Sequence, residues 1–122
     1  MKPTAQYVDG YILAVPKKNL DAYRAMAEKA GAVWKKYGAI DYVECIGEDV
    51  KPGKVTSFPQ AVKLEPDETV IFAWITYKSR EDRDRVNAAV MKDPLMANHD
   101  PKSMPFDGTR MFWGGFEKFV EL

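Results

Sequence analysis

The segment Thr69–Lys78, TVIFAWITYK, restricts the fold more than any other part of the chain, because it is apolar on both sides. Its β-branched and aromatic residues indicate a strand. Side chains alternate between the two faces of a strand. One face would carry Val70, Phe72, Trp74 and Thr76, and the other Ile71, Ala73, Ile75 and Tyr77. A sheet built around this strand therefore has two faces that need to be kept from water.

Three further segments predict strands, namely Tyr7–Val15, Ala39–Gly47 and Met111–Val120. The first and last of them are also apolar or aromatic on both sides. Tyr7, Tyr11 and Leu13 alternate with Val8, Ile12 and Ala14, and Met111 and Trp113 alternate with Phe112 and Phe116. The glycine pair Gly114-Gly115 marks a bend of the last strand, or a place where Tyr11 or Trp113 lies across bare backbone.

Two segments predict helices. Apolar residues recur every three or four positions from Leu20 to Tyr37, with Asn19 as the expected N-cap. This stripe consists of Leu20, Tyr23, Ala27, Ala30, Trp34 and Tyr37. Gly31 within the helix is unfavourable relative to alanine, and close packing on a sheet is one possible reason for it. Ser79 and Asp82 form a capping-box pattern that opens a second helix, and Pro94 ends it. The long connection 48–68 contains VTSFPQAVKL, which predicts an extended arm or an edge strand. Residues 95–108 read as a loop.

The order β-α-β-arm-β-α-β predicts an α+β fold of the ferredoxin-like, split βαβ type, as one domain over residues 1–122. In that fold two helices cover one face of a four-stranded antiparallel sheet. The second apolar face then needs a partner, and a symmetric dimer is the commonest one. We therefore expect a homodimer through the open sheet face, in which two sheets form an eight-stranded α+β barrel.

Composition narrows the class of protein. Lys+Arg and Asp+Glu number 18 each, so the basic excess typical of nucleic-acid binders is missing. The chain has one cysteine, which excludes an internal disulfide. We see neither a signal peptide nor an apolar run of about 18 residues. The expectation is a cytoplasmic protein without a nucleic-acid or membrane partner.

Several stretches together resemble a known family. YVDGYILAVPKKNLDAYR, GAIDYVECIGEDV, FPQAVKLEPDETVIFAWITYKSREDRD, VMKDPLM and MPFDGTRMFWGGFE are similar to the bacterial YbaA-like proteins, a family of unknown function. The resemblance runs from Tyr7 to about Val120. It implies a ferredoxin-like protomer of the dimeric α+β barrel superfamily, which includes cofactor-free monooxygenases, haem-dependent and haem-degrading proteins, isomerases and non-catalytic members. It assigns no catalytic residue to this chain.

Three residues are candidates for acid–base chemistry. Asp9 and Glu44 are carboxylates within apolar strands, where desolvation would raise their pKa values as proton transfer requires. The alternative is that they pair with a lysine or arginine or lie at an exposed edge. His99, the only histidine, stands beside Asp100 in a loop. It is a candidate base or, as the resemblance implies, a haem ligand, against the simpler interpretation of a solvated loop residue.

Five residues are candidates for ligand binding. Tyr11, Trp74, Trp113 and Phe116 could stack on a small planar organic molecule, although aromatic side chains are more common in cores and interfaces. Arg110 could pair with a buried carboxylate or hold an anionic ligand through two hydrogen bonds.

We expect neither a metal nor a cofactor. A zinc site would need two carboxylates in addition to the one histidine and the one cysteine. Cys45 reads as an inert strand residue. The leading functional hypothesis is a small-molecule-binding protein that acts as a cofactor-independent enzyme of the monooxygenase or isomerase type. The alternative is a non-catalytic ligand-binding protein or a structural interaction module.

Overall fold

A computed structural model describes residues 4–122 as a mixed α+β structure. Four strands form one open antiparallel sheet in the order β2-β3-β1-β4. The strands are β1 (Tyr7–Pro16), β2 (Asp41–Ile46), β3 (Glu68–Tyr77) and β4 (Phe112–Glu117). The helices are α1 (Leu20–Tyr37), α2 (Phe58–Ala61), α3 (Arg80–Lys92) and α4 (Pro94–Ala97), with 3₁₀ turns at Lys17–Asn19, Pro101–Ser103 and Gly108–Arg110.

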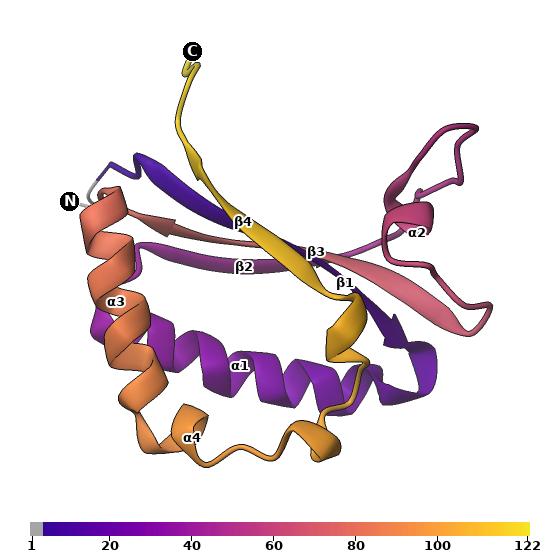
Figure 1. The fold of residues 1–122 in the computed structure, drawn as a ribbon, viewed down its shortest axis with the longest axis horizontal. Coiled ribbons are helices and arrows are strands. Elements are labelled where there is room, and N and C mark those ends of the chain that lie inside the picture. Colours follow the sequence, from indigo (N-terminus) through magenta and orange to yellow (C-terminus); the bar gives the residue numbers. More distant parts are fainter. Residues whose placement is uncertain (1–3) are drawn as a thin grey trace.

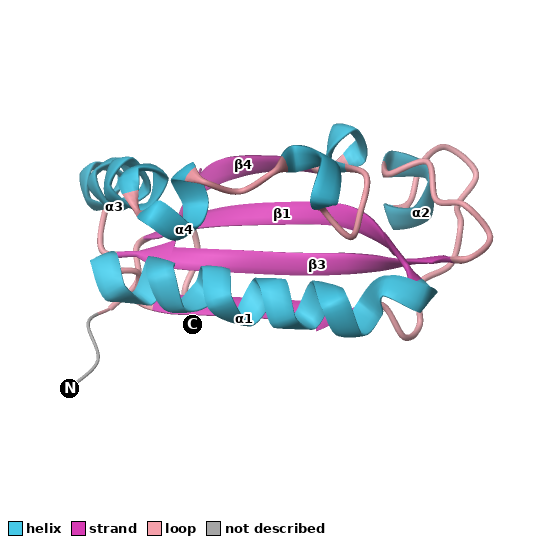
Figure 2. Ribbon diagram, turned by 90° about the horizontal axis from the view of Figure 1, so that it is seen from below, coloured by secondary structure: helices cyan, strands magenta, loops and turns pink. Residues whose placement is uncertain are grey.

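The two long helices lie on one side of the sheet, which we call the helix face (Figure 1). α1 runs along the sheet, α3 lies across one end of it, and α4 follows α3 on the same side (Figure 2). The opposite side, which we call the open face, has no long helix; α2 and its neighbouring loops lie at one end of it, and the C-terminal segment projects beyond β4 on this side (Figure 1). Helices thus cover one of the two apolar faces that the sequence predicts.

The helix face holds most of the core. Leu13, Val15 and Ile71 pack with Tyr23 and Ala27 of α1 in one buried cluster. A second cluster joins β3 to α3. It contains Ile75, Tyr77, Val86 and Val90, the last three with no exposed surface. The predicted inward positions of both helices are confirmed by these contacts.

The predicted helix ends are partly right. Ser79 Oγ accepts from the backbone N–H of Asp82 at 3.0 Å, so this N-cap is confirmed. Asn19 precedes α1, but its side chain makes no cap; its Nδ2 donates instead to the carbonyl of Pro105 at 3.0 Å. α3 ends at Lys92, directly before Pro94, as predicted. Pro94 itself begins α4, because Asp93 caps that short helix and a proline fits its first turn.

The prediction of an extended arm or an edge strand is wrong at the centre of this segment, where α2 forms. Ser57 accepts from the backbone N–H of Gln60, and Pro59 lies in the first turn of α2. Both features start a helix, and they outweigh the weak alternation of the sequence. Val62, just after α2, is fully buried against Ile12, Ala14 and Val70. The arm therefore covers one end of the open face.

The glycine pair of β4 is not a bend. β4 pairs with β1 without interruption, and Gly114 lies opposite Gly10. On the open face the ring of Phe116, rather than Tyr11 or Trp113, lies 3.6 Å from where a Cβ of Gly114 would be. On the helix face a Cβ on Gly115 would collide with the Tyr7 hydroxyl and with Nη2 of Arg83, which would lie 2.7 Å away. Each glycine thus makes room for a side chain on its own face.

Gly31 of α1 is explained by close packing, as the sequence suggested. A Cβ at this position would lie 2.7 Å from Cδ1 and 3.1 Å from Cγ of Tyr42, near the base of that ring. We expect Gly31→Ala to destabilise the protein by about 1–2 kcal/mol in urea unfolding, because the overlap exceeds alanine's helix propensity gain of about 1 kcal/mol.

In a Tyr42→Ala background the same Gly31→Ala substitution should become stabilising, since the ring is gone. A stabilising effect of Gly31→Ala in the otherwise unchanged protein would contradict this account of the packing between α1 and β2.

Candidate functional site

A cavity of about 270 Å³ lies between the helix face of the sheet, α1 and the segment that follows α3. Its wall is mostly apolar. The apolar side chains include Leu13, Met26, Trp34, Met96, Phe106 and Met111. Small apolar cavities with a few polar groups are the usual form of a small-molecule site. We therefore take this cavity as the candidate site.

Three tyrosines, Tyr11, Tyr23 and Tyr42, bring polar atoms to the cavity wall. The Tyr23 hydroxyl donates to Oε1 of Glu44, and the Tyr42 hydroxyl donates to Oε2 of the same carboxylate at 2.7 Å. Burial, and then the charge of Glu44, raise the pKa values of Tyr23 and Tyr42 well above their ordinary value of 10. Both hydroxyls therefore stay protonated and hold Glu44 between them.

A second hollow, of about 490 Å³, lies outside the first, between α1 and the free edge of β2. It is more polar, with Arg24, Glu28 and Lys35 among its lining residues. Tyr23 and Tyr42 line both hollows, and Glu44 lines the outer one. The two tyrosines, linked by Glu44, thus form the partition between the cavity and this outer groove.

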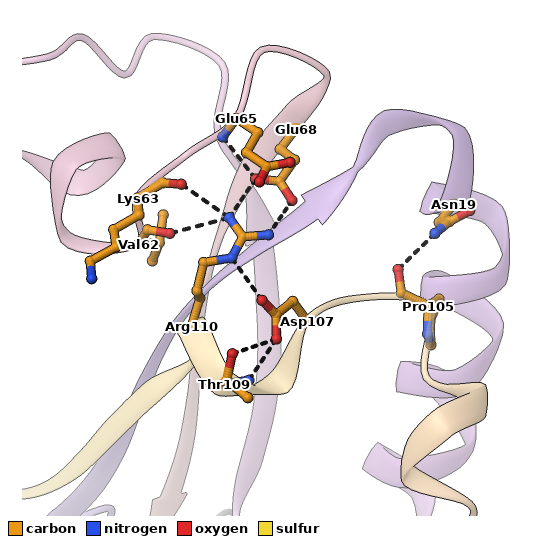
Figure 3. A network of polar contacts seen from close by, with 9 residues as sticks. All are labelled: Asn19, Val62, Lys63, Glu65, Glu68, Pro105, Asp107, Thr109 and Arg110. Atoms are coloured by element: carbon orange, nitrogen blue, oxygen red, sulfur yellow. Dashed lines mark hydrogen bonds and ion pairs between the residues drawn. The ribbon is translucent and has the colours of Figure 1, made fainter.

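The segment that closes the cavity is fastened by an arginine clamp (Figure 3). Arg110 donates to both carboxylate oxygens of Glu68, at 2.7 and 2.6 Å, and to Asp107 at 3.0 Å. The hydrogen bonds from Arg110 hold the pKa of Glu68 below its usual range. With the bond from Asn19 to Pro105, this clamp holds Phe106 against the cavity. The predicted two-point hydrogen bonding of Arg110 exists, but it engages Glu68 of the same chain.

Asp9 lies outside the cavity, on β1 beneath α3. It is completely buried, and neither carboxylate oxygen has a hydrogen-bond partner. The nearest cation is Arg83, whose Nε lies 3.6 Å from Oδ1. Burial raises the pKa of Asp9, and the charge of Arg83, together with the nearby polar side chains of Asn87 and Tyr77, only partly offsets this effect. The expected desolvation of this carboxylate is present, but Asp9 does not line the candidate site.

The other predicted site residues divide between the two faces of the sheet. His99 lines the cavity on its exposed side, with Nδ1 2.7 Å from the Met96 carbonyl oxygen. Trp113 stacks on Tyr11 on the helix face, with ring centroids 5.8 Å apart. Trp74 and Phe116 line a hollow on the open face, and Trp74 is also among the residues that line the cavity. The cavity thus brings Tyr11 and His99 together, whereas Phe116 and Arg110 lie elsewhere.

Tyr23 and Tyr42 were missed as site residues. Tyr42 is in phase with Glu44 along one strand, which was a usable signal. Tyr23 was assigned only to the apolar stripe of α1, and nothing in the sequence showed that its hydroxyl would reach β2. Among residues 4–122, no group of three or more His, Cys, Asp or Glu side chains is placed to hold a metal ion. No helix in the same range is long and apolar enough to span a bilayer.

The buried Asp9 gives a prediction for stability against pH. Because its pKa is raised on folding, the folded chain keeps this proton at pH values where the unfolded chain has lost it, so Asp9 lowers stability as pH rises above about 4. In urea unfolding, Asp9→Asn should therefore gain stability relative to the parent protein as pH rises from about 4 towards the raised pKa. Asp21→Asn, at an exposed position of α1, is the matched control. A difference between Asp9→Asn and the parent that stays constant across this range would contradict the prediction.

Comparison with known proteins places the chain in a family. Residues 6–108 match the family described as "Protein of unknown function (DUF1428)". Over 116 residues the chain is 51% identical to the uncharacterized protein YbaA of Escherichia coli K12. The aligned residues cover 95% of this chain and 98% of that protein. The protein of the same name from Shigella flexneri is similar to the same extent. The chain therefore belongs to the DUF1428 family, as the resemblance of its motifs to the YbaA-like proteins predicted.

Proposed function

We propose that this protein binds a small, largely apolar organic molecule in the cavity between the sheet and α1. The observation that carries the proposal is the wall itself, in which apolar and aromatic side chains enclose about 270 Å³ and three tyrosines are among the few polar residues. Tyr23 and Tyr42 are fixed by Glu44, so the site is largely preformed. A preformed site loses little entropy when a ligand is bound.

A cofactor-independent enzyme is the second candidate function. The observation that favours it is the position of Glu44, a carboxylate that accepts from two tyrosines at the partition between cavity and groove. A carboxylate so placed can take up a proton passed through a tyrosine hydroxyl. A non-catalytic ligand carrier has the same cavity and does not need this proton path.

The proposed location is the cytoplasm, where the free thiol of Cys45 would stay reduced.

Filling the cavity tests the binding function. Ala30 of α1 lines the cavity, whereas Ala32 is exposed on the other side of the same helix. In an NMR titration with indane, a bicyclic hydrocarbon, the parent protein and Ala32→Phe should show saturable shifts of cavity residues. Ala30→Phe should lose at least tenfold in affinity, because its ring occupies the space. Circular dichroism checks that each variant is folded, and Ala30→Val is the milder replacement if Ala30→Phe is not.

Absence of indane binding to the parent protein would contradict the proposal. So would undiminished binding to folded Ala30→Phe or Ala30→Val.

We also propose that the chain is a homodimer of ferredoxin-like protomers that meet through their open faces. The strand order β2-β3-β1-β4 and its antiparallel pairing support a protomer of the split βαβ type. Phe72, Phe112 and Phe116 are 43%, 46% and 63% exposed on the open face, beside a hollow of about 520 Å³ over Gly10 and Gly114. An apolar surface of this kind is typical of an interface. A second copy would bring aromatic side chains to fill that hollow.

A charge on the open face should separate the dimer. Trp74→Asp and Phe116→Asp should each give a folded monomer in sedimentation velocity, because two buried carboxylates would face each other across the symmetry axis. Met91→Asp is the control, since Met91 is 55% exposed on α3, away from the open face. A parent protein that sediments as a monomer at micromolar concentration would contradict the proposal, as would a stable dimer of folded Phe116→Asp.

A further inference from the structure

We infer that the cavity selects an uncharged ring compound with a carbonyl-type oxygen, and that the Tyr11 hydroxyl donates the hydrogen bond that recognises it. This inference rests on the proposed binding function and names the class of ligand. Three features of the cavity support it: an unused donor, a fixed ring that carries this donor, and negative charge behind it.

The unused donor is the hydroxyl of Tyr11. Tyr23 and Tyr42 donate to Glu44, whereas the Tyr11 hydroxyl has no hydrogen bond to any residue in the described range 4–122. It is also not among the polar atoms that are sealed from solvent without a partner, which are the Asp9 oxygens and Arg83 Nε. The Tyr11 hydroxyl is therefore still reachable. An unpaired donor in an apolar cavity gains most from a ligand that brings an acceptor.

The ring that carries this hydroxyl is held in place. Tyr11 lies in β1, paired with Ala73 on one side and Trp113 on the other. Its ring stacks on that of Trp113 with an interplanar angle of 23°. The guanidinium carbon of Arg83 lies over the same tryptophan ring, 5.8 Å from its centroid, and this cation–π contact adds to the restraint. A donor on a fixed ring selects ligands by the position of their acceptor.

Charge explains why the ligand should be neutral. Burial raises the pKa of Tyr11 well above its usual value, and the charges of Asp9 and Glu44 raise it further, although Arg83 opposes them. The hydroxyl therefore stays protonated as a donor, and the carboxylate of Glu44, held by Tyr23 and Tyr42, disfavours another negative charge nearby. The guanidinium of Arg83 already donates to the Tyr7 hydroxyl at 3.1 Å. Lys29 and His99 also line the cavity, but both residues are exposed, so solvent screens their interaction with a ligand.

Size and shape complete the description of the ligand. The cavity volume lies just below the range that holds drug-sized molecules, so one or two fused rings fit it. Trp34 and Phe106 provide flat apolar surfaces among the lining residues. Bicyclic ketones have this size, are uncharged, and have one carbonyl oxygen.

Three probes of nearly the same shape test the inference: indane, 1-indanone and indane-1-carboxylate. Dissociation constants are measured by NMR titration at neutral pH for the parent protein, Tyr11→Phe and Tyr7→Phe. The parent protein should bind 1-indanone about fivefold more tightly than indane, as expected for one neutral hydrogen bond in an apolar site. It should bind the carboxylate more weakly than either.

Tyr11→Phe should bind 1-indanone and indane equally, because only the hydroxyl is removed and the ring stays. Tyr7→Phe, on the same strand but outside the cavity, should keep the fivefold preference. Equal binding of indane and 1-indanone by the parent protein would overturn this inference and leave the proposed binding function intact. A preference retained in Tyr11→Phe would overturn it as well. If neither neutral probe binds the parent protein, the proposed function itself fails, and the inference fails with it.

Discussion

Strand β1 has apolar or aromatic side chains on both of its faces, and the rest of the molecule is arranged around this constraint. It is hydrogen-bonded to β3 on one side and to β4 on the other. On the helix face, Leu13 and Val15 pack against α1. On the open face, only Ile12 and Ala14 are covered, by Val62 beyond α2. The uncovered remainder is what leads us to propose a second copy.

The helix face also explains why a cavity remains. α1 meets the sheet with the large rings of Tyr23, Trp34 and Tyr37, whereas α3 contributes the shorter side chains of Val86 and Val90. The chain between α3 and β4 closes the space beside them. That closing segment is secured by the clamp of Arg110 on Glu68 (Figure 3). A two-point ion pair of this type holds a loop more firmly than a single contact. The clamp is a positioning device for the cavity wall, although its arginine does not touch the cavity.

The periodicity of apolar residues predicted the sheet and the two long helices, and the Ser79 cap also predicted the start of α3. The sequence also anticipated the close packing at Gly31 and the burial of Asp9. It failed for α2, where two local start signals outweighed an extended pattern, and for Asn19, whose side chain bonds to a residue far along the chain. The candidate site was predicted only in part. Its partition depends on Tyr23 meeting Glu44 across two elements, and single-sequence periodicity contains no information about such contacts.

Native mass spectrometry of the protein purified from the cells that produce it tests the central claim most directly. The claim is that the open face binds a second copy and the helix face encloses a small molecule. The account predicts a dimer that retains a small uncharged adduct. In Ala30→Phe it predicts that the dimer remains and that only the adduct is lost. A bare monomer at micromolar concentration, or an adduct that Ala30→Phe retains in full, would contradict it.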